Sequence, residues 1–427
     1  MKISSIHGRR VWDSRGNPTV EVDVELESGA VGRAIAPAGA SRGKREAIDL
    51  RDGGGRVGGF DVSKAVGSVN GAIAGALVGE DATDQSAIDN LLIQLDGTDN
   101  KGNLGGNATV ATSMACMQAV AQAQSTPLWA HISQTYDTQP SVPLPEIQIF
   151  GGGAHAFGRV DIQDFMVMVP GADTFEEMME ITREVYFAAG DILKSKGKRS
   201  GVADEGGWWP NFDSNEEALE TLVRAIERAG EKPGVRVGIS LDIAASEFYQ
   251  NGEYKLALEN RAFGTEKLID LLGNWLSDYP ILSIEDPVDE DDRDGMIEFT
   301  RRFGAQVQII GDDYLVTNAR AVQQAVDDQA CNAVLVKVNQ AGTVSEAVQA
   351  ALMARDSGWG AVVSARSGET EDVFISHLST GLGMVQLKVG SFTRSERMAK
   401  WNECLRISES LKAYAAGRSM QNTWWGS

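Results

Sequence analysis

Residues 281–287 read ILSIEDP, a short apolar run that ends in an acidic residue, Glu285. A β-branched run of this length is typical of a strand that is buried on both faces. Six further stretches share the pattern: IQDFMVMV (162–169), ISLDIAASE (239–247), VQIIGDD (307–313), AVLVKVNQ (333–340), AVVSARSGE (361–369) and VQLKVGS (385–391). The ionisable residues of the seven stretches are Asp164, Asp242, Glu285, Asp312, Lys337, Arg366 and Lys388.

The spacing of these stretches predicts the fold of most of the chain. From Asp242 to Lys388 the ionisable residues lie 22 to 43 positions apart, which leaves room for one helix and two loops between strands. Strand–helix units repeated in this way close into a (β/α) barrel. Charged residues at the C-terminal ends of barrel strands predict an active site there.

Composition excludes some classes of partner. The chain has 427 residues, with 60 Asp and Glu against 39 Lys and Arg, a net charge of −21. So acidic a surface repels phosphate backbones and anionic lipids, so we expect neither nucleic acid nor membrane as a partner. Three dispersed cysteines without a CxxC pattern indicate free thiols, and neither a signal peptide nor a membrane span is evident. We therefore expect a cytoplasmic protein.

The residues before the barrel predict a separate α+β domain. VEVDVEL at 20–26 alternates strictly, and VGRAIA at 31–36 predicts a second strand. Helical patterns follow at about 61–78, 84–95 and 106–124. Pro140, Pro143 and Pro145 favour an extended connector. We therefore predict an α/β protein with an N-terminal α+β domain over 1–135 and a barrel with the catalytic site over 140–427.

Three of the strand-end acids suggest a metal site. Asp242, Glu285 and Asp312 lie on successive units, and carboxylates gathered at one barrel mouth need a cation to offset their repulsion. All-oxygen ligation selects Mg²⁺ or Mn²⁺ over zinc. The alternative for each acid is a helix or turn cap, which is as plausible for any one of them but less so for three in matching positions.

Other residues predict proton transfer and anion binding. Lys337 ends a buried strand, where nearby cations would lower its pKa and make it a candidate general base, unless it forms a structural ion pair. Glu205 lies in ADEGGWWPN, where two glycines suggest a rigid loop over the barrel mouth. Arg366 and Ser367 offer a phosphate cradle, and Lys388 a second cation. His155 lies in a glycine-rich loop, but a lone histidine is more often structural.

Taken together, these segments resemble the enolase family over nearly the whole chain. The matching motifs are DSRGNPTVEV (13–22), GGGAHA (151–156), VDIQDF (160–165), DEGGWWPN (204–211), LDIAASEFY (241–249), SIEDP (283–287), GDD (311–313), VKVNQ (336–340), RSGETED (366–372) and LKVGS (387–391). The resemblance implies an enolase-type (β/α)8 barrel with an unusual ββαα start. It also implies a homodimer, two Mg²⁺ ions in each active site and dehydration of 2-phosphoglycerate to phosphoenolpyruvate.

The resemblance also assigns roles to residues. Asp242, Glu285 and Asp312 match ligands of the tightly held Mg²⁺, and Ser41 matches a mobile-loop serine that reaches the second ion. Lys337 matches the base that removes the C2 proton, and Glu205 the acid that assists departure of the C3 hydroxyl. The remaining matches bind the small anionic substrate: His155, Gln163, Asp164, Arg366, Ser367 and Lys388.

Several positions depart from the family pattern. Ala365 stands where enolases carry a histidine before Arg-Ser-Gly-Glu-Thr, and Asp164 is one methylene shorter than the family's glutamate. Arg42 in the mobile loop and Arg159 after His155 add positive charge, so with Ala365 they are candidates for altered specificity. Bulky Trp208 and Trp209 follow DEGG.

Three readings follow from this pattern. The first is a specialised enolase-type enzyme with an enlarged, more cationic site, such as the one in phosphinothricin-type antibiotic pathways whose enolpyruvate ester carries an additional carboxylate. The second is an ordinary glycolytic enolase with tolerated substitutions. The third is an enolase fold that serves as a binding protein without catalysis.

Overall fold

The N-terminal part of the protein is a three-stranded antiparallel sheet covered by helices. The structure, a computed structural model, describes residues 1–40, 43–156, 158–384 and 386–411. The sheet has the order β1 (Ile3–Trp12), β2 (Pro18–Leu26) and β3 (Val31–Ile35). The strands predicted at 20–26 and 31–36 are β2 and β3, whereas β1 has no counterpart in the sequence analysis. Buried and exposed residues alternate irregularly along β1, so its sequence pattern predicts a strand less clearly than that of β2.

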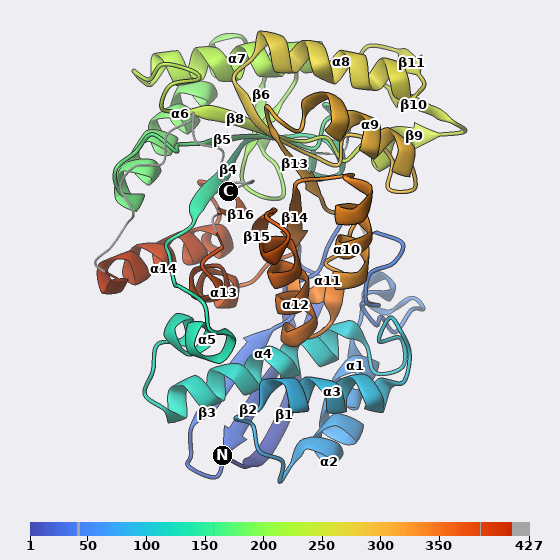
Figure 1. Cartoon of the computed structure of the whole chain (residues 1–427), viewed down its shortest axis with the longest axis vertical. Coiled ribbons are helices and arrows are strands. Elements are labelled where there is room, and N and C mark those ends of the chain that lie inside the picture. The colour runs from blue at the N-terminus through green and yellow to red at the C-terminus, as the bar shows by residue number, and fades with distance from the viewer. Residues whose placement is uncertain (41–42, 157, 385, 412–427) are drawn as a thin grey trace.

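Helix α4 (Gly106–Ala123) packs against β2 and β3 and is buried on nearly all sides. Gly32 of β3 permits this close approach, because a Cβ there would lie 2.0 Å from the carbonyl oxygen of Ala115. The other helices of this part lie around the sheet and α4 in the lower half of Figure 1. They are α1 (Ser63–Ser68), a π-helical turn (Val69–Ile73), α2 (Ala74–Leu77), α3 (Gln85–Asp96) and α5 (Leu128–Tyr136).

A closed barrel forms the rest of the described chain (Figure 1). Pairing of the last barrel strand with the first, Lys388 opposite Glu146, closes the sheet. In the described ranges the barrel contains eight strands: β4 (Leu144–Gly151), β5 (Asp164–Met168), β8 (Gly238–Asp242), β12 (Ile281–Glu285), β13 (Gln308–Gly311), β14 (Ala333–Val336), β15 (Gly360–Ser364) and β16 (Gln386–Ser391). The predicted eight-stranded α/β barrel is thereby confirmed.

Strand β5 runs opposite to its neighbours. It pairs antiparallel with both β4 and β8, whereas β8 and the later strands pair in parallel. Asp164 is therefore the first residue of its strand and not the last, and it lies opposite Asp242 in the register. The expectation that every site residue follows its strand is wrong here, yet the reversal still brings Asp164 to the barrel mouth.

Helices surround the barrel and many begin with a side-chain cap. Thr174, Ser214 and Thr343 each accept a hydrogen bond from the backbone of the third residue that follows, which satisfies an otherwise free donor. The helices are α6 (Phe175–Ser195), α7 (Asn215–Arg228), α8 (Thr265–Asp278), α9 (Arg293–Phe303), α10 (Ala319–Asp328), α11 (Val338–Ala341), α12 (Val344–Asp356), α13 (Phe374–Leu382) and α14 (Ser395–Leu411).

Several short strands and turns lie outside the eight barrel strands and the helices. A hairpin of β6 (Arg199–Val202) and β7 (Trp208–Pro210) extends the barrel sheet beside β4. A separate small sheet consists of β9 (Tyr249–Gln250), β10 (Glu253–Leu256) and β11 (Arg261–Phe263). The 3-10 turns are Arg56–Gly59, Gly153–Ala156 and Ala245–Phe248.

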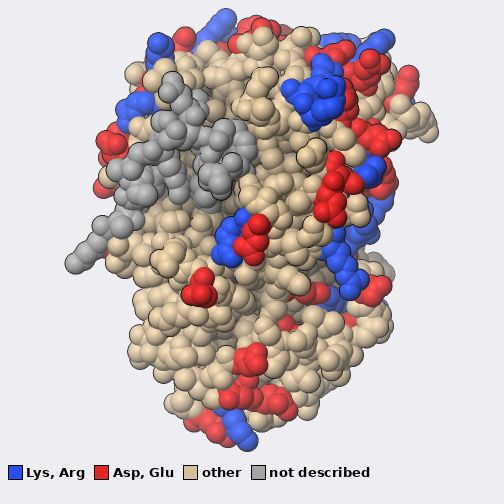
Figure 2. Space-filling model, in the orientation of Figure 1, with Lys and Arg blue, Asp and Glu red and all other residues tan. Residues whose placement is uncertain are grey.

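The surface carries acidic and basic side chains close together on the face drawn in Figure 2, chiefly toward its upper and right margins. In the part of the chain that the structure describes, no helix has the length and apolar character of a bilayer span. Cys116, Cys331 and Cys404 are buried free thiols.

Candidate active site

Most of the predicted site residues line a small cavity of about 20 Å³ at the barrel mouth, whereas Glu285, Asp312 and Arg159 are not among its lining residues. Gly39 and Ala40 of the N-terminal part also line it. A backbone pair between Ala38 and Gly368 holds this N-terminal loop against the barrel. The predicted residues that line the cavity are His155, Gln163, Asp164, Glu205, Asp242, Lys337, Ala365, Arg366, Ser367 and Lys388. Ser41 and Arg42 fall outside the described residues.

Lys388 joins two of the predicted metal ligands. Its Nζ lies 2.8 Å from Oδ2 of Asp242 and 2.7 Å from Oε2 of Glu285. The two acids are register partners at the ends of β8 and β12. Burial and the charge of Asp242 raise the pKa of Glu285 well above its ordinary value. Lys388 of β16 thereby forms ion pairs with the carboxylates at the ends of β8 and β12.

Lys337 forms the second lysine–carboxylate pair of the site. Its ammonium donates to Oδ2 of Asp312, whose other oxygen accepts from Nε2 of Gln340 at 2.9 Å. Burial acts to lower the pKa of Lys337, but the charges of Asp312, Glu285 and Asp313 together outweigh it and the pKa is raised. The expected lowering, which assumes a metal ion and other cations nearby, stays a prediction.

The predicted metal ligands keep one free carboxylate oxygen among the described residues. Oε1 of Glu285 is buried without a hydrogen-bond partner, so this acid retains a free ligand oxygen. Oxygen ligands of this kind are those that Mg²⁺ prefers. Among the described residues, two groups of possible ligand atoms lie within 4.8 Å of one another: His155 with Asp164 and Glu205, and Asp286 with Asp312 and Asp313. Asp312 belongs to the second group, whereas Asp242 and Glu285 belong to neither.

Glu205 lies on residues 203–207, which we call the acid loop. The Glu205 carbonyl accepts from the backbone N–H of Ser391 at 2.9 Å, and the Gly206 carbonyl accepts from the Tyr186 hydroxyl at 2.9 Å. Gly206 has φ +93°, which explains the glycine at this position. The prediction of a well-held loop agrees with these contacts.

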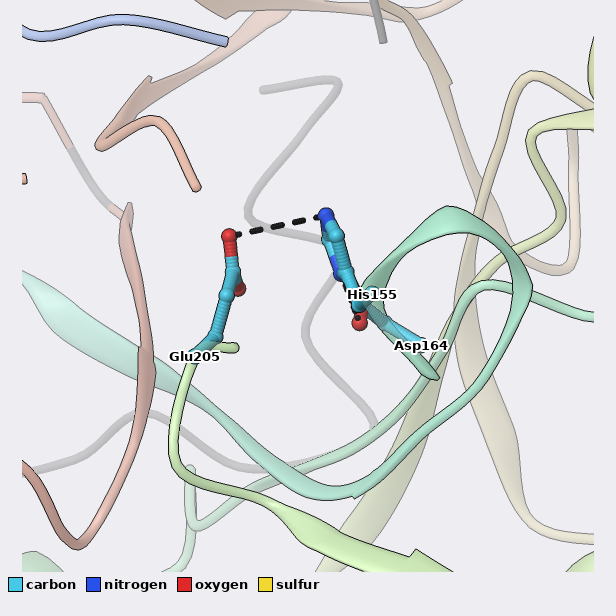
Figure 3. A group of neighbouring side chains, drawn as sticks. All are labelled: His155, Asp164 and Glu205. Atoms are coloured by element: carbon cyan, nitrogen blue, oxygen red, sulfur yellow. Dashed lines mark hydrogen bonds and ion pairs between the residues drawn. The ribbon is translucent and has the colours of Figure 1, made fainter. Parts of the chain in front are cut away.

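His155 lies between two carboxylates (Figure 3). Its Nδ1 is 3.0 Å from Oδ1 of Asp164, and its Nε2 is 3.7 Å from Oε1 of Glu205. Burial acts to lower the pKa of His155, but the charges of the two carboxylates raise it to about 9. Burial alone would raise the pKa of Asp164, whereas His155 lowers it to about 2. The histidine is therefore a charged part of the site.

The predicted phosphate cradle contains a cross-domain ion pair. Nη1 of Arg366 lies 2.9 Å from Oε2 of Glu46, and both side chains are buried. Oγ of Ser367 is buried without a hydrogen-bond partner, so it is available to a bound group. A guanidinium and a hydroxyl side by side suit phosphate or phosphonate oxygens.

Family comparison agrees with this geometry. A model of the enolase C-terminal TIM barrel domain matches residues 139–423, and one of the enolase N-terminal domain matches residues 3–132. The chain belongs to the enolase family. It is thus an enolase-family enzyme of the lyase type, and the predicted family resemblance is confirmed. The predicted boundary between 135 and 140 stays a prediction.

Two of the departures from the enolase pattern have different surroundings. Ala365 lines the cavity and is buried, so its small side chain directly affects the space available. Arg159 is exposed, donates to Oδ1 of Asn211 and is not among the described residues that line the cavity.

The sequence analysis of this enolase-family protein missed Glu46, Gln148 and Gln340. Each is buried and bonded to a predicted site residue: Glu46 to Arg366, Gln148 to Asp164 and Gln340 to Asp312. Gln148 is a polar residue within the apolar run IQIF (147–150), and that pattern alone could have drawn attention to it.

Proposed function

We propose that this protein is a Mg²⁺-dependent enzyme that forms an enolpyruvate phosphate or phosphonate ester through an enediolate, as a specialised member of the enolase family. Carboxyphosphonoenolpyruvate synthase of phosphonate antibiotic biosynthesis is the kind of enzyme it would be. The observation that carries this proposal is Ala365, whose methyl group lines the cavity where enolases have a histidine.

In the proposed reaction Lys337 removes the proton from C2, and Glu205 donates a proton to the leaving group at C3. The opposed pair suits an elimination, because base and acid come from different elements that line one cavity. Arg366 and Ser367 bind the phosphate or phosphonate, and Lys388 lies beside the substrate carboxylate. Gln163, His155 and Asp164 complete the binding surface.

Asp242, Glu285 and Asp312 would hold one Mg²⁺, and Ser41 would reach a second. The ions would stabilise the negative charge that develops on the substrate carboxylate and screen Lys337 from the charge of Asp312. In enzymes of this family a lysine can remove a proton next to a carboxylate while Mg²⁺ stabilises the resulting enediolate.

Extra volume at Ala365 distinguishes the specialised enzyme from an ordinary glycolytic enolase. The ordinary enzyme remains the second candidate, because the carboxylates, Lys337, Glu205 and Arg366 all keep the enolase pattern. A missing proton-transfer group costs about 10²–10⁴-fold in rate. We therefore expect dehydration of 2-phosphoglycerate to be slower than in an ordinary enolase by a factor in this range.

The ultraviolet absorbance of an enolpyruvate, measured with 2-phosphoglycerate and Mg²⁺, tests the proposal. We expect a signal about 10²–10⁴-fold weaker than an ordinary enolase gives, together with Mg²⁺-dependent exchange of deuterium at C2. An ordinary enolase rate would contradict the specialised function, and absence of exchange and of Mg²⁺ binding would favour a non-catalytic protein.

Substitution of Ala365 by histidine sharpens the test. An imidazole at this position would fill cavity volume and return a proton-transfer group, so we predict that A365H dehydrates 2-phosphoglycerate about 10²-fold faster than the wild type. A365L is the matched control, since it fills the volume without a titratable group. Equal rates in wild type and A365H would argue against a role for this position in specificity.

The assembly and location are further proposals. Family membership supports a homodimer in the cytoplasm that acts on a small phosphoglycerate-like anion, without nucleic acid or membrane partners. Light scattering of the purified protein tests the dimer.

A further inference from the structure

Gln148 has a buried amide that bridges two parts of the site. The side chain projects from β4 and is fully buried. Its Oε1 accepts from the backbone N–H of Gly207 at 2.9 Å, and its Nε2 donates to Oδ1 of Asp164. One amide thus joins the acid loop to the first residue of β5.

These bonds complete a ring around the leaving-group end of the cavity. Asp164 bonds His155, and His155 approaches Glu205, which is two residues before Gly207. Figure 3 shows Glu205 and His155 directed toward each other, with Asp164 at the other end of the imidazole. A change at Gln148 therefore alters the distance across which Glu205 and His155 face each other.

The partners fix the orientation of the amide. The N–H of Gly207 can only donate, and an ionised Asp164 can only accept, so the amide carbonyl must face the loop and the NH₂ must face β5. Gly207 is part of the same arrangement, because a Cβ at this position would lie 2.3 Å from Oε1 of Gln148. The second glycine of DEGG therefore has a structural reason: it admits this amide.

The lengths of the Asp164 and Gln148 side chains together determine where the Asp164 carboxylate lies. Asp164 has one methylene where the family's glutamate has two, so its carboxylate is held back from the cavity by about one carbon–carbon bond, roughly 1.5 Å. Gln148 has the longer side chain of the pair and reaches across to the shorter acid. Together the two side chains keep the contact while the carboxylate stays close to β4.

We propose that Gln148 is a positioning residue that sets the width of the leaving-group end of the cavity. It does so by holding Asp164 toward β4 and the acid loop toward the barrel. This inference rests on the proposed function, in which Glu205 acts on the leaving group. It assigns a role to a neutral residue that contacts neither the proposed metal ligands nor the proposed base.

The first test exchanges the two side-chain lengths. In Q148N the amide is one methylene too short to keep both bonds, whereas Q148N/D164E returns the summed length of the pair. A misplacement near 1 Å costs about 10²-fold in rate. With 2-phosphoglycerate and Mg²⁺ in D₂O, we expect Q148N to lower elimination about 10²-fold relative to deuterium exchange at C2. The double variant restores the reach between residues 148 and 164 but not the bond to Gly207, so it should recover that ratio only in part.

A matched control is Q308N. Gln308 is also a fully buried barrel glutamine, bonded to Gln386 at 2.6 Å, and it does not line the cavity. Shortening it should lower stability without changing the ratio of elimination to exchange. An unchanged ratio in Q148N, or an equal change in Q308N, would overturn the inference.

A second measurement needs no substrate. The ring ¹⁵N resonances of His155, assigned by their loss in H155Q, report on its contacts with Asp164 and Glu205. We expect them to shift in Q148N, to return toward wild-type positions in Q148N/D164E and to stay in place in Q308N. If the wild type neither exchanges nor eliminates, the proposed function fails while these resonances still decide the role of Gln148. Unshifted resonances in Q148N would refute it.

Discussion

Lys337 is the residue on which proton removal depends in the proposed reaction. Its ammonium is buried and bonded to Asp312, and the raised pKa means that the neutral form needs the charge of Asp312 to be offset. This dependence ties the activity of the base to the carboxylate beside it.

We predict that K337M abolishes deuterium exchange at C2, with a loss of about 10²–10⁴-fold or more. E205Q should keep the exchange and lose elimination, because Glu205 acts on the other side of the substrate. Isotope exchange followed by mass spectrometry distinguishes the two variants. Equal loss of exchange in both would contradict the division of roles between base and acid.

A pH dependence of stability follows from His155. Its pKa in the folded protein is about 9 against an ordinary 6.5, so the charged form is favoured by folding. The stabilisation is fully present below pH 6.5 and is lost as the pH rises through 9. Its magnitude is on the order of 3 kcal/mol.

Urea unfolding between pH 6 and 10 measures this effect. We expect the free energy of unfolding to fall over that interval in the wild type and to change less in H155Q. Titration of Lys337 does not contribute to this fall between pH 6 and 10, since the pKa of Lys337 is raised above the ordinary 10.5. Identical pH profiles for the two proteins would contradict the charged state of His155.

At the scale of elements, α14 holds the phosphate cradle in place. Arg397 of this helix is fully buried and donates to the carbonyls of Arg366 at 2.6 Å, Val389 at 3.0 Å and Ser367. A helix outside the barrel thereby fixes the backbone that follows β15 and that lies in β16.

We predict that R397M destabilises the protein by about 3 kcal/mol or more, because it removes three hydrogen bonds from a charged donor. It should also raise KM for the phosphorylated substrate more than it lowers kcat, since Arg366 and Ser367 lose their backbone support. R397K, which keeps a charge and a donor, should lie between wild type and R397M. Chemical unfolding and steady-state kinetics together test this, and an unchanged KM in R397M would argue against the role of α14.

At the scale of the whole molecule, the two parts of the chain share one interior and one site. A single hydrophobic cluster includes Val22 of the N-terminal sheet and Val334 of the barrel. The buried pair of Glu46 and Arg366 crosses the same boundary. The substrate cavity is therefore complete only when both parts are folded.

Metal binding should stabilise this whole unit. We predict that Mg²⁺ at 100 times its dissociation constant raises the free energy of unfolding by about 2.7 kcal/mol relative to protein treated with EDTA. D242N should lose most of this increment, because it removes a charged ligand. Thermal unfolding with and without Mg²⁺, alongside calorimetric titration, checks the prediction. The same Tm in both conditions would contradict a cation site at these carboxylates.

Much of this fold could be predicted because each barrel strand carries its own signal. The apolar runs that end at Asp242, Glu285 and Asp312 are local in sequence, and parallel pairing then brings their ends together. The direction of β5 could not be read in this way, because a run of residues has the same periodicity in either direction. Only its pairing partners show that the start of this strand, and with it Asp164, lies at the barrel mouth.

The site was predictable where a charged residue stood out against an apolar strand. The site was not predictable where a neutral residue acts through its neighbours, as Gln148 does through Asp164 and Gly207. The direction of the Lys337 pKa shift was also beyond sequence reasoning, since it depends on the balance between burial and several neighbouring charges. Distances between segments far apart in the chain decide such effects.

The seam between β4 and β16 has a consequence for biosynthesis. It joins strands that begin at Leu144 and Gln386, so the barrel stays open until nearly the whole chain has left the ribosome. Until then β4 presents an unpaired, apolar edge of the kind that promotes association between nascent chains. Production of this protein should therefore benefit from slow synthesis or from chaperones that shield this edge, and truncation before β16 should yield aggregates instead of a smaller folded enzyme.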